Sequence, residues 1–388
     1  MSSLSNIIPV RARRPSASRM KIDSRYAPAL ATVGLFVAML TVGSVRFPNF
    51  LSGQVFLNLL IDHSFLVVVA VGMTFVILSG GIDLSVGAVV ALSMILSAKM
   101  LQLGLNPGLV IVLVLLMGFA FGGVQGLLIQ YFDIQPFIAT LAGMFLARGL
   151  CYVTSLDSIP IRDSFYTAMS QTRIGLLFIR TPDYHVYGAV IVPVSDAFVS
   201  PAVLIALMVV AVAFFVLHHT RFGRTVYAIG GNENSAVLMG LAVARTKVLV
   251  YAISGLCAAM GGILWNLYSL SGFPLAGIGM ELDAIAAVVV GGALLTGGYG
   301  YVLGSVVGVL ILGLVQTFIA FDGTLSSWWT RIFIGTLLLI FILLQRLFSG
   351  RGLRVPGLQA VLKVPAKPAE MAGAADQATQ PLITGRRR

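Results

Sequence analysis

The sequence predicts an all-α polytopic membrane protein of about ten transmembrane helices, some of them broken or re-entrant at glycine-rich segments. Hydrophobic residues make up 58% of the chain and charged residues 10%, and the mean hydropathy of +0.98 lies far outside the range of water-soluble domains. Apolar runs of about 20 residues, the helix length that crosses a hydrocarbon core of about 30 Å, recur from residue 28 to residue 348. Only helices and closed barrels satisfy their backbone hydrogen bonds in lipid, and the sequence lacks the alternating pattern of barrel strands.

Each predicted crossing follows from one apolar run, and the runs are 28–45, 54–79, 84–103, 108–131, 136–155, 201–220, 246–270, 281–298, 301–321 and 328–348. Basic residues precede the first run, as in a cleaved signal peptide, but this run is long and no small-residue cleavage site follows it. The runs together define a transmembrane domain, residues 28–348. A basic N-terminus (1–27) precedes this domain, and a tail (349–388) rich in Pro, Ala, Gly and basic residues follows it, for which we expect disorder.

The distribution of basic residues predicts the orientation of the chain. Lys and Arg number six in residues 1–27, four in 218–247 and eight from Arg346 onward, and basic residues are retained on the cytoplasmic side of a membrane. Both termini and the loop 218–247 are therefore expected in the cytoplasm. The loop 156–200, in which three Arg are balanced by four Asp, is expected in the periplasm. The net charge of +11 reflects this asymmetry and attraction to anionic lipid rather than nucleic-acid binding.

One carboxylate lies inside the second apolar region. Asp83 is the only charged side chain between Ser64 and Ala98, a stretch that would make a helix of about 52 Å, too long for one crossing and too short for two with a turn. We therefore predict a break at a polar, glycine-rich step formed by Ser79, Gly80, Gly81, Asp83 and Ser85. Asp83 or Ser85 can cap the helix that follows, and Asp83 can also face a water-filled path. The two interpretations do not exclude each other.

A second glycine-rich break is predicted near the other end of the chain. The segment VVVGGALLTGGYGYVLGSVVGVL (288–310) repeats the order of features found in VILSGGIDLSVGAVVALSMIL (76–96): an apolar run, paired glycines, a short polar or aromatic step and a Gly- and Val-rich helix. Paired interruptions in the two halves of a transporter indicate a substrate pathway, although close helix packing also explains the glycines. The candidate residues here are Glu281, Asp283, Gly291, Gly292, Gly297 and Gly298.

The predicted cytoplasmic loop 218–247 contains one short helix within SAVLMGLA. Its candidate residues are Gly230, Gly231, Asn232, Asn234, Ser235, Ala236 and Gly240. The glycine pair ends what precedes it, and Asn232 or Asn234 can cap the helix. Ala236 and Gly240, four residues apart, would share one face of this helix. Because so short a helix is unstable in isolation, we expect it to rest on a partner.

Three long motifs resemble the permease subunit of the ribose- and galactose-type sugar ABC importers: GMTFVILSGGIDLSVG (72–87), TRFGRTVYAIGGNENSAVLMG (220–240) and ELDAIAAVVVGGALLTGGYG (281–300). Within that family, FDGTLSSWWTRIFIGTLLLIFILLQR (321–346) and SIPI (158–161) are similar to the galactofuranose permease that pairs with a second, related permease. The chain differs from that permease in its longer basic N-terminus, its 156–200 loop and its tail.

The resemblance implies an import complex in the inner membrane of a bacterium. Such a complex contains two permease chains, identical or related, two ATPase domains on the cytoplasmic side and a periplasmic sugar-binding protein that docks on the outer face. This chain would be a non-catalytic transport subunit without a cofactor of its own, because ATP and Mg are used by the separate ATPase. The short helix around Asn234, Ser235, Ala236 and Gly240 would be the coupling helix that contacts the ATPase. The segment LSGGI (78–82) resembles an ATPase signature, but the chain has no G-x-x-x-x-G-K-[ST] loop.

A secondary transporter or channel, driven by an ion gradient through Asp83, Glu281 or Asp283, is the alternative to an ATP-driven importer. No acid, base or metal-ligand residues converge at a spacing that indicates an enzyme or a metal site, and Cys151 and Cys257 lie in different predicted helices. Side chains of the kind that contact sugars occur at Trp265, Asn266, Tyr268 and Gln316, although helix packing or interfacial placement explains each of them.

Overall fold

The structure, a computed structural model, describes residues 27–48, 50–175, 184–187, 190–193, 197–326 and 328–348. The predicted disordered tail, 349–388, and all but the last residue of the predicted basic N-terminus, 1–27, lie outside the described residues. Within the described ranges the chain forms thirteen helices and six short strands.

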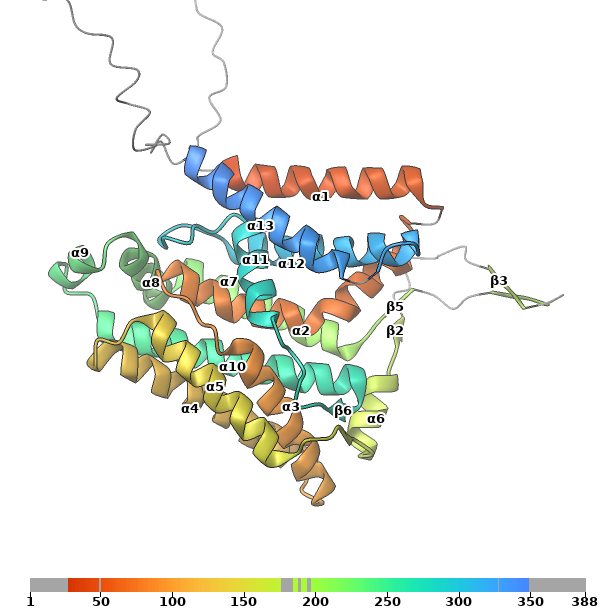
Figure 1. Cartoon of the computed structure of the whole chain (residues 1–388), viewed down its shortest axis with the longest axis horizontal. Coiled ribbons are helices and arrows are strands. Elements are labelled where there is room, and N and C mark those ends of the chain that lie inside the picture. The colour runs from red at the N-terminus through yellow and green to blue at the C-terminus, as the bar shows by residue number, and fades with distance from the viewer. Residues whose placement is uncertain are drawn as a thin grey trace, which may run out of the picture. The chain divides into compact units, whose positions relative to one another are not determined.

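Ten of the helices correspond in order to the ten predicted apolar runs (Figure 1). They are α1 (Ala27–Arg46), α2 (Gly53–Leu78), α3 (Val86–Gln102), α4 (Pro107–Tyr131), α5 (Pro136–Thr154), α7 (Pro201–His219), α10 (Val243–Ser269), α11 (Met280–Val290), α12 (Val302–Asp322) and α13 (Trp329–Phe348). The other three lie in the connecting segments: α6 (Ser164–Gln171), α8 (Arg221–Gly231) and α9 (Glu233–Leu238).

The strands form three antiparallel pairs in the connections between helices. They are β1 (Ile159–Pro160) with β6 (Ser271–Gly272), β2 (Ile174–Gly175) with β5 (Phe198–Val199), and β3 (Tyr184–Tyr187) with β4 (Val190–Pro193). The β1–β6 pair joins the segment after α5 to the segment after α10, and the Gln54 side chain of α2 accepts a hydrogen bond from the Phe198 N–H at 3.1 Å. The start of α2 and the ends of α5 and α10 therefore lie at one end of the helical body, together with α6.

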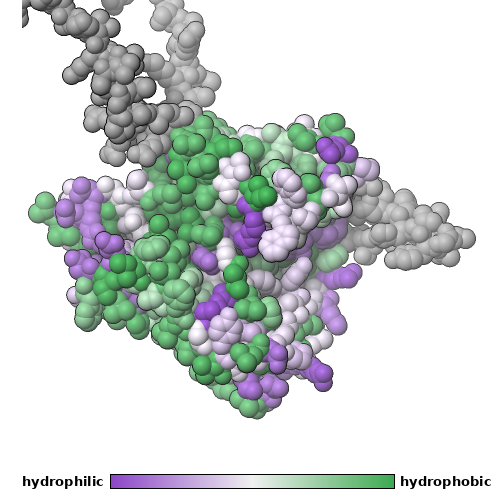
Figure 2. Space-filling model, in the orientation of Figure 1, coloured by the Kyte–Doolittle hydropathy of each residue, from purple (hydrophilic) through white to green (hydrophobic). Residues whose placement is uncertain are grey.

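The helices confirm a polytopic membrane protein. Six described helices are long and apolar enough to cross a membrane, namely α2, α4, α5, α7, α10 and α12, and α1, α3 and α13 contain shorter apolar stretches. Figure 2 shows apolar side chains over much of the visible surface, while polar side chains gather near α9, near α6 and across the middle of the view. Ten crossings and the placement of the two ends in cytoplasm and periplasm stay predictions.

Helices α2 and α10 form the centre of the helical body. In the apolar stretch of α2 78% of the residues are buried and in that of α10 67%, whereas in α4 only 22% are. α10 packs against α4, α2 and α3, and α2 also packs against α12 and α7. Small residues allow these close contacts: a Cβ added to Gly126 of α4 would lie 2.8 Å from the Cα of Val248 in α10. The exposed apolar faces of α4, α5 and α7 are suited to lipid or to another membrane subunit.

The predicted helix 281–298 is shorter in the structure. α11 ends at Val290, and the chain then runs without regular structure to Tyr301. The physical reason is the backbone of Gly292, Gly297 and Gly298, whose φ angles of +92°, +82° and +75° do not fit a right-handed helix. The predicted break between α2 and α3 is present as a non-helical segment, 79–85.

Candidate functional site

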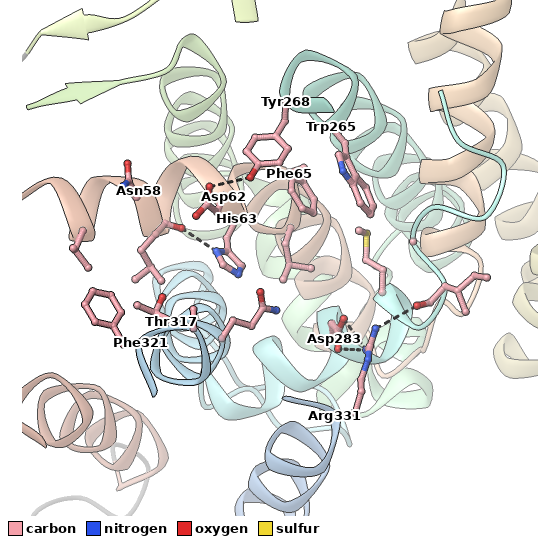
Figure 3. A pocket seen from close by; sticks show the side chains of 18 residues that line it. Asn58, Asp62, His63, Phe65, Trp265, Tyr268, Asp283, Thr317, Phe321 and Arg331 are labelled. Atoms are coloured by element: carbon pink, nitrogen blue, oxygen red, sulfur yellow. Dashed lines mark hydrogen bonds and ion pairs between the residues drawn. The ribbon is translucent and has the colours of Figure 1, made fainter. Parts of the chain in front are cut away.

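A cavity of about 670 Å³ opens at the α6 end of the helical body. It is lined from α2, α10, α11, α12, α13 and the turn before α11 (Figure 3), by Val55, Asn58, Leu59, Asp62, His63, Phe65, Leu66, Trp265, Tyr268, Gly277, Ile278, Met280, Asp283, Gln316, Thr317, Ala320, Phe321 and Arg331. By the predicted orientation this end faces the periplasm. We name this space the outer cavity.

One wall of the outer cavity combines aromatic rings with a carboxylate. The rings of Phe65 and Trp265 stack with centroids 4.6 Å apart and planes 9° apart. The Tyr268 hydroxyl donates a hydrogen bond to Asp62 Oδ1 at 3.2 Å. The spacing explains the arrangement, because Asp62 and Phe65 are three residues apart on α2, and Trp265 and Tyr268 are three apart on α10, so each pair shares a helix face. This wall therefore offers both an apolar surface and hydrogen-bonding groups.

The opposite side of the outer cavity holds an ion pair. Arg331 Nη1, from α13, lies 2.8 Å and 3.0 Å from the two carboxylate oxygens of Asp283 in α11, and Arg331 Nη2 donates to the Ile278 carbonyl at 3.4 Å. Half of the Arg331 side chain is exposed, so the pair is worth at most about 1 kcal/mol. Its effect is chiefly on position, because it ties α13 to the turn before α11.

A second arginine holds the same turn from the other side. Arg148 of α5 donates hydrogen bonds from Nη1 to the carbonyls of Pro274 and Ala276, at 2.9 Å and 2.8 Å. The turn contains Gly277 and Gly279, with φ angles of +65° and +82°, a conformation that favours glycine. Two guanidinium groups from different helices thus hold the turn that borders the outer cavity.

Asp83 lies away from the outer cavity, in the break between α2 and α3. It is 1% exposed and does not line the cavity. One carboxylate oxygen accepts hydrogen bonds from the N–H and the hydroxyl of Ser85, at 2.9 Å and 2.7 Å, and the other accepts from the hydroxyl of Ser254 in α10 at 2.7 Å. Ser85 is the N-cap residue of α3, and its side chain makes no capping hydrogen bond, so Asp83 closes a turn just before the helix instead of capping the free N–H groups of α3 as predicted. Ser79 is the C-cap residue that follows α2, and its hydroxyl donates to the Val76 carbonyl at 2.8 Å.

The three glycine-rich segments singled out from the sequence meet at one place. The Gly298 N–H donates to the Leu78 carbonyl, at the end of α2, at 2.9 Å. A Cβ added to Gly297 would lie 2.8 Å from the Gly80 backbone N and 2.9 Å from the Gly230 Cα. We name Gly80, Gly230, Gly297 and Gly298 the glycine junction. It joins the α2–α3 break, the end of α8 and the segment after α11, backbone against backbone.

The short helix α9 differs from the prediction in the face it presents. Asn232 caps it, because its side chain accepts the Ser235 N–H at 2.8 Å. Ala236, however, is fully buried against Ile229 and Val243. The helix ends at Leu238, and Gly240 lies beyond it with a φ of +73°, so Ala236 and Gly240 do not share a face. The exposed apolar residues of α9 and its C-terminus are Val237, Leu238 and Met239, while Asn234, Ser235 and Gly231 are exposed as well.

The remaining candidates are divided between the outer cavity and other places. Trp265, Tyr268 and Gln316 line the cavity, whereas Asn266 is buried and donates to the Met94 carbonyl at 3.2 Å. Asp283 lines the outer cavity but Glu281 does not. The carboxylate of Glu281 lies against Gly87 of α3 instead. Gly291 caps the end of α11 and Gly292 follows it, outside the cavity. Gly81 lies against Tyr251 of α10.

Sequence reasoning missed several residues of the site. These are Asn58, Asp62, His63, Thr317, Arg331 and, behind the turn, Arg148. Four of them are ionisable and lie within or beside apolar runs, where such side chains usually mark a functional path. That signal could have found them.

Comparison with known proteins identifies the family. Residues 55–342 match the family described as the permease component of the branched-chain amino acid transport system. The inner membrane ABC transporter permease protein YjfF of Escherichia coli K12 is 49% identical over 83% of this chain and 92% of its own length. The fructose import permease FruG of Bifidobacterium longum is 42% identical, over 84% and 92%, and the ribose import permease RbsC of Bacillus subtilis is 40% identical, over 81% and 91%.

No solved structure gives a significant match to this chain. The family match covers most of the helical body, from the first turn of α2 into α13, and therefore includes both the outer cavity and the glycine junction. The chain belongs to this family of transport-system permeases, together with the ribose and fructose import permeases that it resembles.

Proposed function

We propose that the chain is the transmembrane permease subunit of an ATP-binding cassette importer for a monosaccharide. A periplasmic binding protein would deliver the sugar to the outer face, and a separate ATPase chain would supply the energy from the cytoplasm. The observation that carries this proposal is the outer cavity, a concave site at the predicted periplasmic end in which aromatic rings and polar side chains from five helices converge.

The outer cavity has the chemistry that a sugar requires. A monosaccharide presents hydroxyl groups around its ring and apolar C–H groups on its faces. The stacked pair Phe65–Trp265 offers an apolar surface, and Asn58, Asp62, Gln316 and Thr317 offer hydrogen-bond partners. A few well-placed polar groups in an otherwise apolar site are typical of small-molecule binding. Galactofuranose or a related sugar is the substrate that the resemblance of 321–346 and 158–161 favours.

The ATPase would contact the opposite end of the helical body. The exposed side chains of Val237, Leu238 and Met239, at and just after the C-terminus of α9, form a small apolar surface outside the apolar helices. α8 connects this surface to the glycine junction through Gly230. An ATPase that holds α9 would thus act on the ends of α2 and α11, whose rearrangement would open and close the path. A second permease chain, identical or related, would complete that path.

Reconstitution tests this proposal. The chain is co-expressed with the ATPase, binding protein and any second permease encoded beside it, and the complex is placed in proteoliposomes. We expect uptake of radiolabelled sugar that requires ATP and the loaded binding protein, and that stops when the phosphate-binding lysine of the ATPase is changed to Ala. Uptake that proceeds without ATP and collapses with an ionophore would instead identify an ion-driven secondary transporter.

A further inference from the structure

The outer cavity carries an uncompensated negative charge. Among the described residues that line it, three carry a full charge: Asp62, Asp283 and Arg331. Arg331 is engaged, since its guanidinium contacts both carboxylate oxygens of Asp283 and the Ile278 carbonyl. Asp62 forms no ion pair with any described residue, and its hydrogen-bond partner is the neutral hydroxyl of Tyr268. Two carboxylates against one guanidinium, with His63 counted as neutral, leave a net charge of −1.

The position of Asp62 places this charge where a ligand must pass. Asp62 is exposed, and it lies one helical turn before Phe65 on the cavity face of α2, beside the stacked aromatic pair (Figure 3). Tyr268 donates to Oδ1 only, which leaves Oδ2 of this exposed side chain able to accept a hydrogen bond from a sugar hydroxyl. A hydrogen bond to a carboxylate is stronger than one to a neutral oxygen. The same carboxylate repels a ligand that carries its own negative charge.

We propose that Asp62 makes the outer cavity a charge filter that admits neutral sugars and excludes anionic ones such as uronates and sugar phosphates. This inference rests on the proposed function of the chain as a sugar permease. A second anion held 4 Å from Asp62 would be disfavoured roughly fivefold even at the dielectric constant of water, and by more in a partly enclosed cavity. The selection would act after the binding protein has released its sugar, and would therefore be a second check on the substrate.

Collisional quenching of Trp265 fluorescence measures the filter directly. The chain has three tryptophans, and changing Trp328 and Trp329, which do not line the cavity, to Phe leaves Trp265 as the only reporter. The purified chain in an uncharged detergent is titrated with acrylamide, iodide and caesium at constant ionic strength. We expect acrylamide and caesium to quench Trp265 and iodide to quench it weakly. Asp62→Asn, which keeps an acceptor for Tyr268, should raise the iodide quenching constant roughly fivefold.

Two matched variants separate the local charge from other effects. Asp62→Glu keeps the charge and should keep iodide out. Asp133→Asn removes a charge from the loop between α4 and α5, outside the cavity, and should change nothing. Equal iodide quenching in the parent and in Asp62→Asn would overturn the proposal.

A sugar pair then tests the consequence for ligands. D-galactose and D-galacturonate differ at one position only, where galactose carries a neutral hydroxymethyl group and galacturonate carries a carboxylate. Galactose should alter the Trp265 emission of the parent, and galacturonate should do so only in Asp62→Asn. Equal effects of both sugars on the parent, or no effect of galactose, would refute the filter. Neither outcome would affect ATP-dependent uptake by the reconstituted complex, so failure of the filter and failure of the proposed function are distinguishable.

Discussion

Gly230 is the position at which a single methyl group should disturb the helical body most selectively. A Cβ at this residue would overlap with both the Leu78 carbonyl oxygen and the Gly298 backbone nitrogen. Both distances would be well below 3.0 Å, the closest approach that Cβ atoms make in real structures. Both atoms belong to backbone, so neither can move aside as a flexible side chain would. The neighbouring Gly231 has nothing within 4 Å of its Cβ position. Gly230→Ala and Gly231→Ala are therefore a matched pair, one residue apart on α8.

The magnitude follows from three contributions. Forcing a methyl group into a filled space costs about 1–3 kcal/mol, and loss of the Gly298–Leu78 hydrogen bond costs about 0.5–1.5 kcal/mol. The gain in helix propensity from Gly to Ala returns at most about 1 kcal/mol. With the full propensity gain subtracted, we expect Gly230→Ala to lower the free energy of unfolding by about 0.5–3.5 kcal/mol. Gly231→Ala should be neutral or slightly stabilising, because only the gain in helix propensity applies.

Thermal unfolding of the purified chain in detergent, followed by a thiol-reactive dye that reports exposure of the buried Cys151 and Cys257, measures the difference. Gly230→Ala should unfold several degrees lower than Gly231→Ala. In the reconstituted complex, Gly230→Ala should also reduce sugar uptake per ATP hydrolysed, because α8 can no longer hold the ends of α2 and of the segment after α11 together. Identical unfolding temperatures and identical uptake for the two variants would refute the glycine junction as a packed contact that transmits motion.

Three further predictions concern other parts of the chain. Asp83→Asn keeps an acceptor for the Ser85 N–H and should fold normally, whereas Asp83→Leu leaves the buried Ser254 hydroxyl and the Ser85 N–H without an acceptor, at about 1–3 kcal/mol each, and should lower the yield of folded protein in membranes. An Asn variant that folds but does not transport would show that a structural role alone does not account for Asp83. In a version without native cysteines, Gln171→Cys should react in intact cells with an impermeant maleimide and Ser235→Cys should not; labelling of position 235 from outside would contradict the orientation. Leu238→Asp should abolish co-purification of the ATPase while leaving the yield of the chain unchanged, and full retention of the ATPase would remove α9 as its docking site.

The sequence predicts the helices well because a single property, apolar length, determines them. The run 136–155 becomes α5 from Pro136 to Thr154, where Pro at the first helical position fixes the start. The end of α11 at Val290 also follows from the local sequence, because the glycine pair Gly291–Gly292 comes directly after it. The outer cavity could not be predicted in this way, because Asp62 and Tyr268 are about 200 residues apart and meet only through the packing of α2 on α10.

The order and lengths of the helices favour an internal repeat in which α2–α5 correspond to α10–α13. The glycine pattern instead indicates that segment 76–96 corresponds to segment 288–310. The lengths of α2 to α5 are 26, 17, 25 and 19 residues, and those of α10 to α13 are 27, 11, 21 and 20. In this alignment the counterpart of the break 79–85 is the turn before α11, 270–279, rather than the segment after it. Each break follows a long buried helix and precedes a short one, which is the pattern of discontinuous helices in transporters with internal repeats. The glycine pattern alone does not decide between the two correspondences, because glycines serve both breaks and close packing.

The two central helices connect the outer cavity to the region of the glycine junction and α9. α2 carries Asp62 of the outer cavity in its first half and ends with Leu78, whose carbonyl accepts the Gly298 N–H of the glycine junction, 16 residues or about 24 Å further along the helix. α10 begins next to α9 and ends with Trp265 and Tyr268 in the cavity. Because both helices are mostly buried, a displacement at one end is carried to the other as movement of a whole helix rather than lost in local bending. In the non-helical segments after α2 and before α11, glycines permit other backbone angles, so we expect these segments to change conformation if the proposed path alternates between two arrangements.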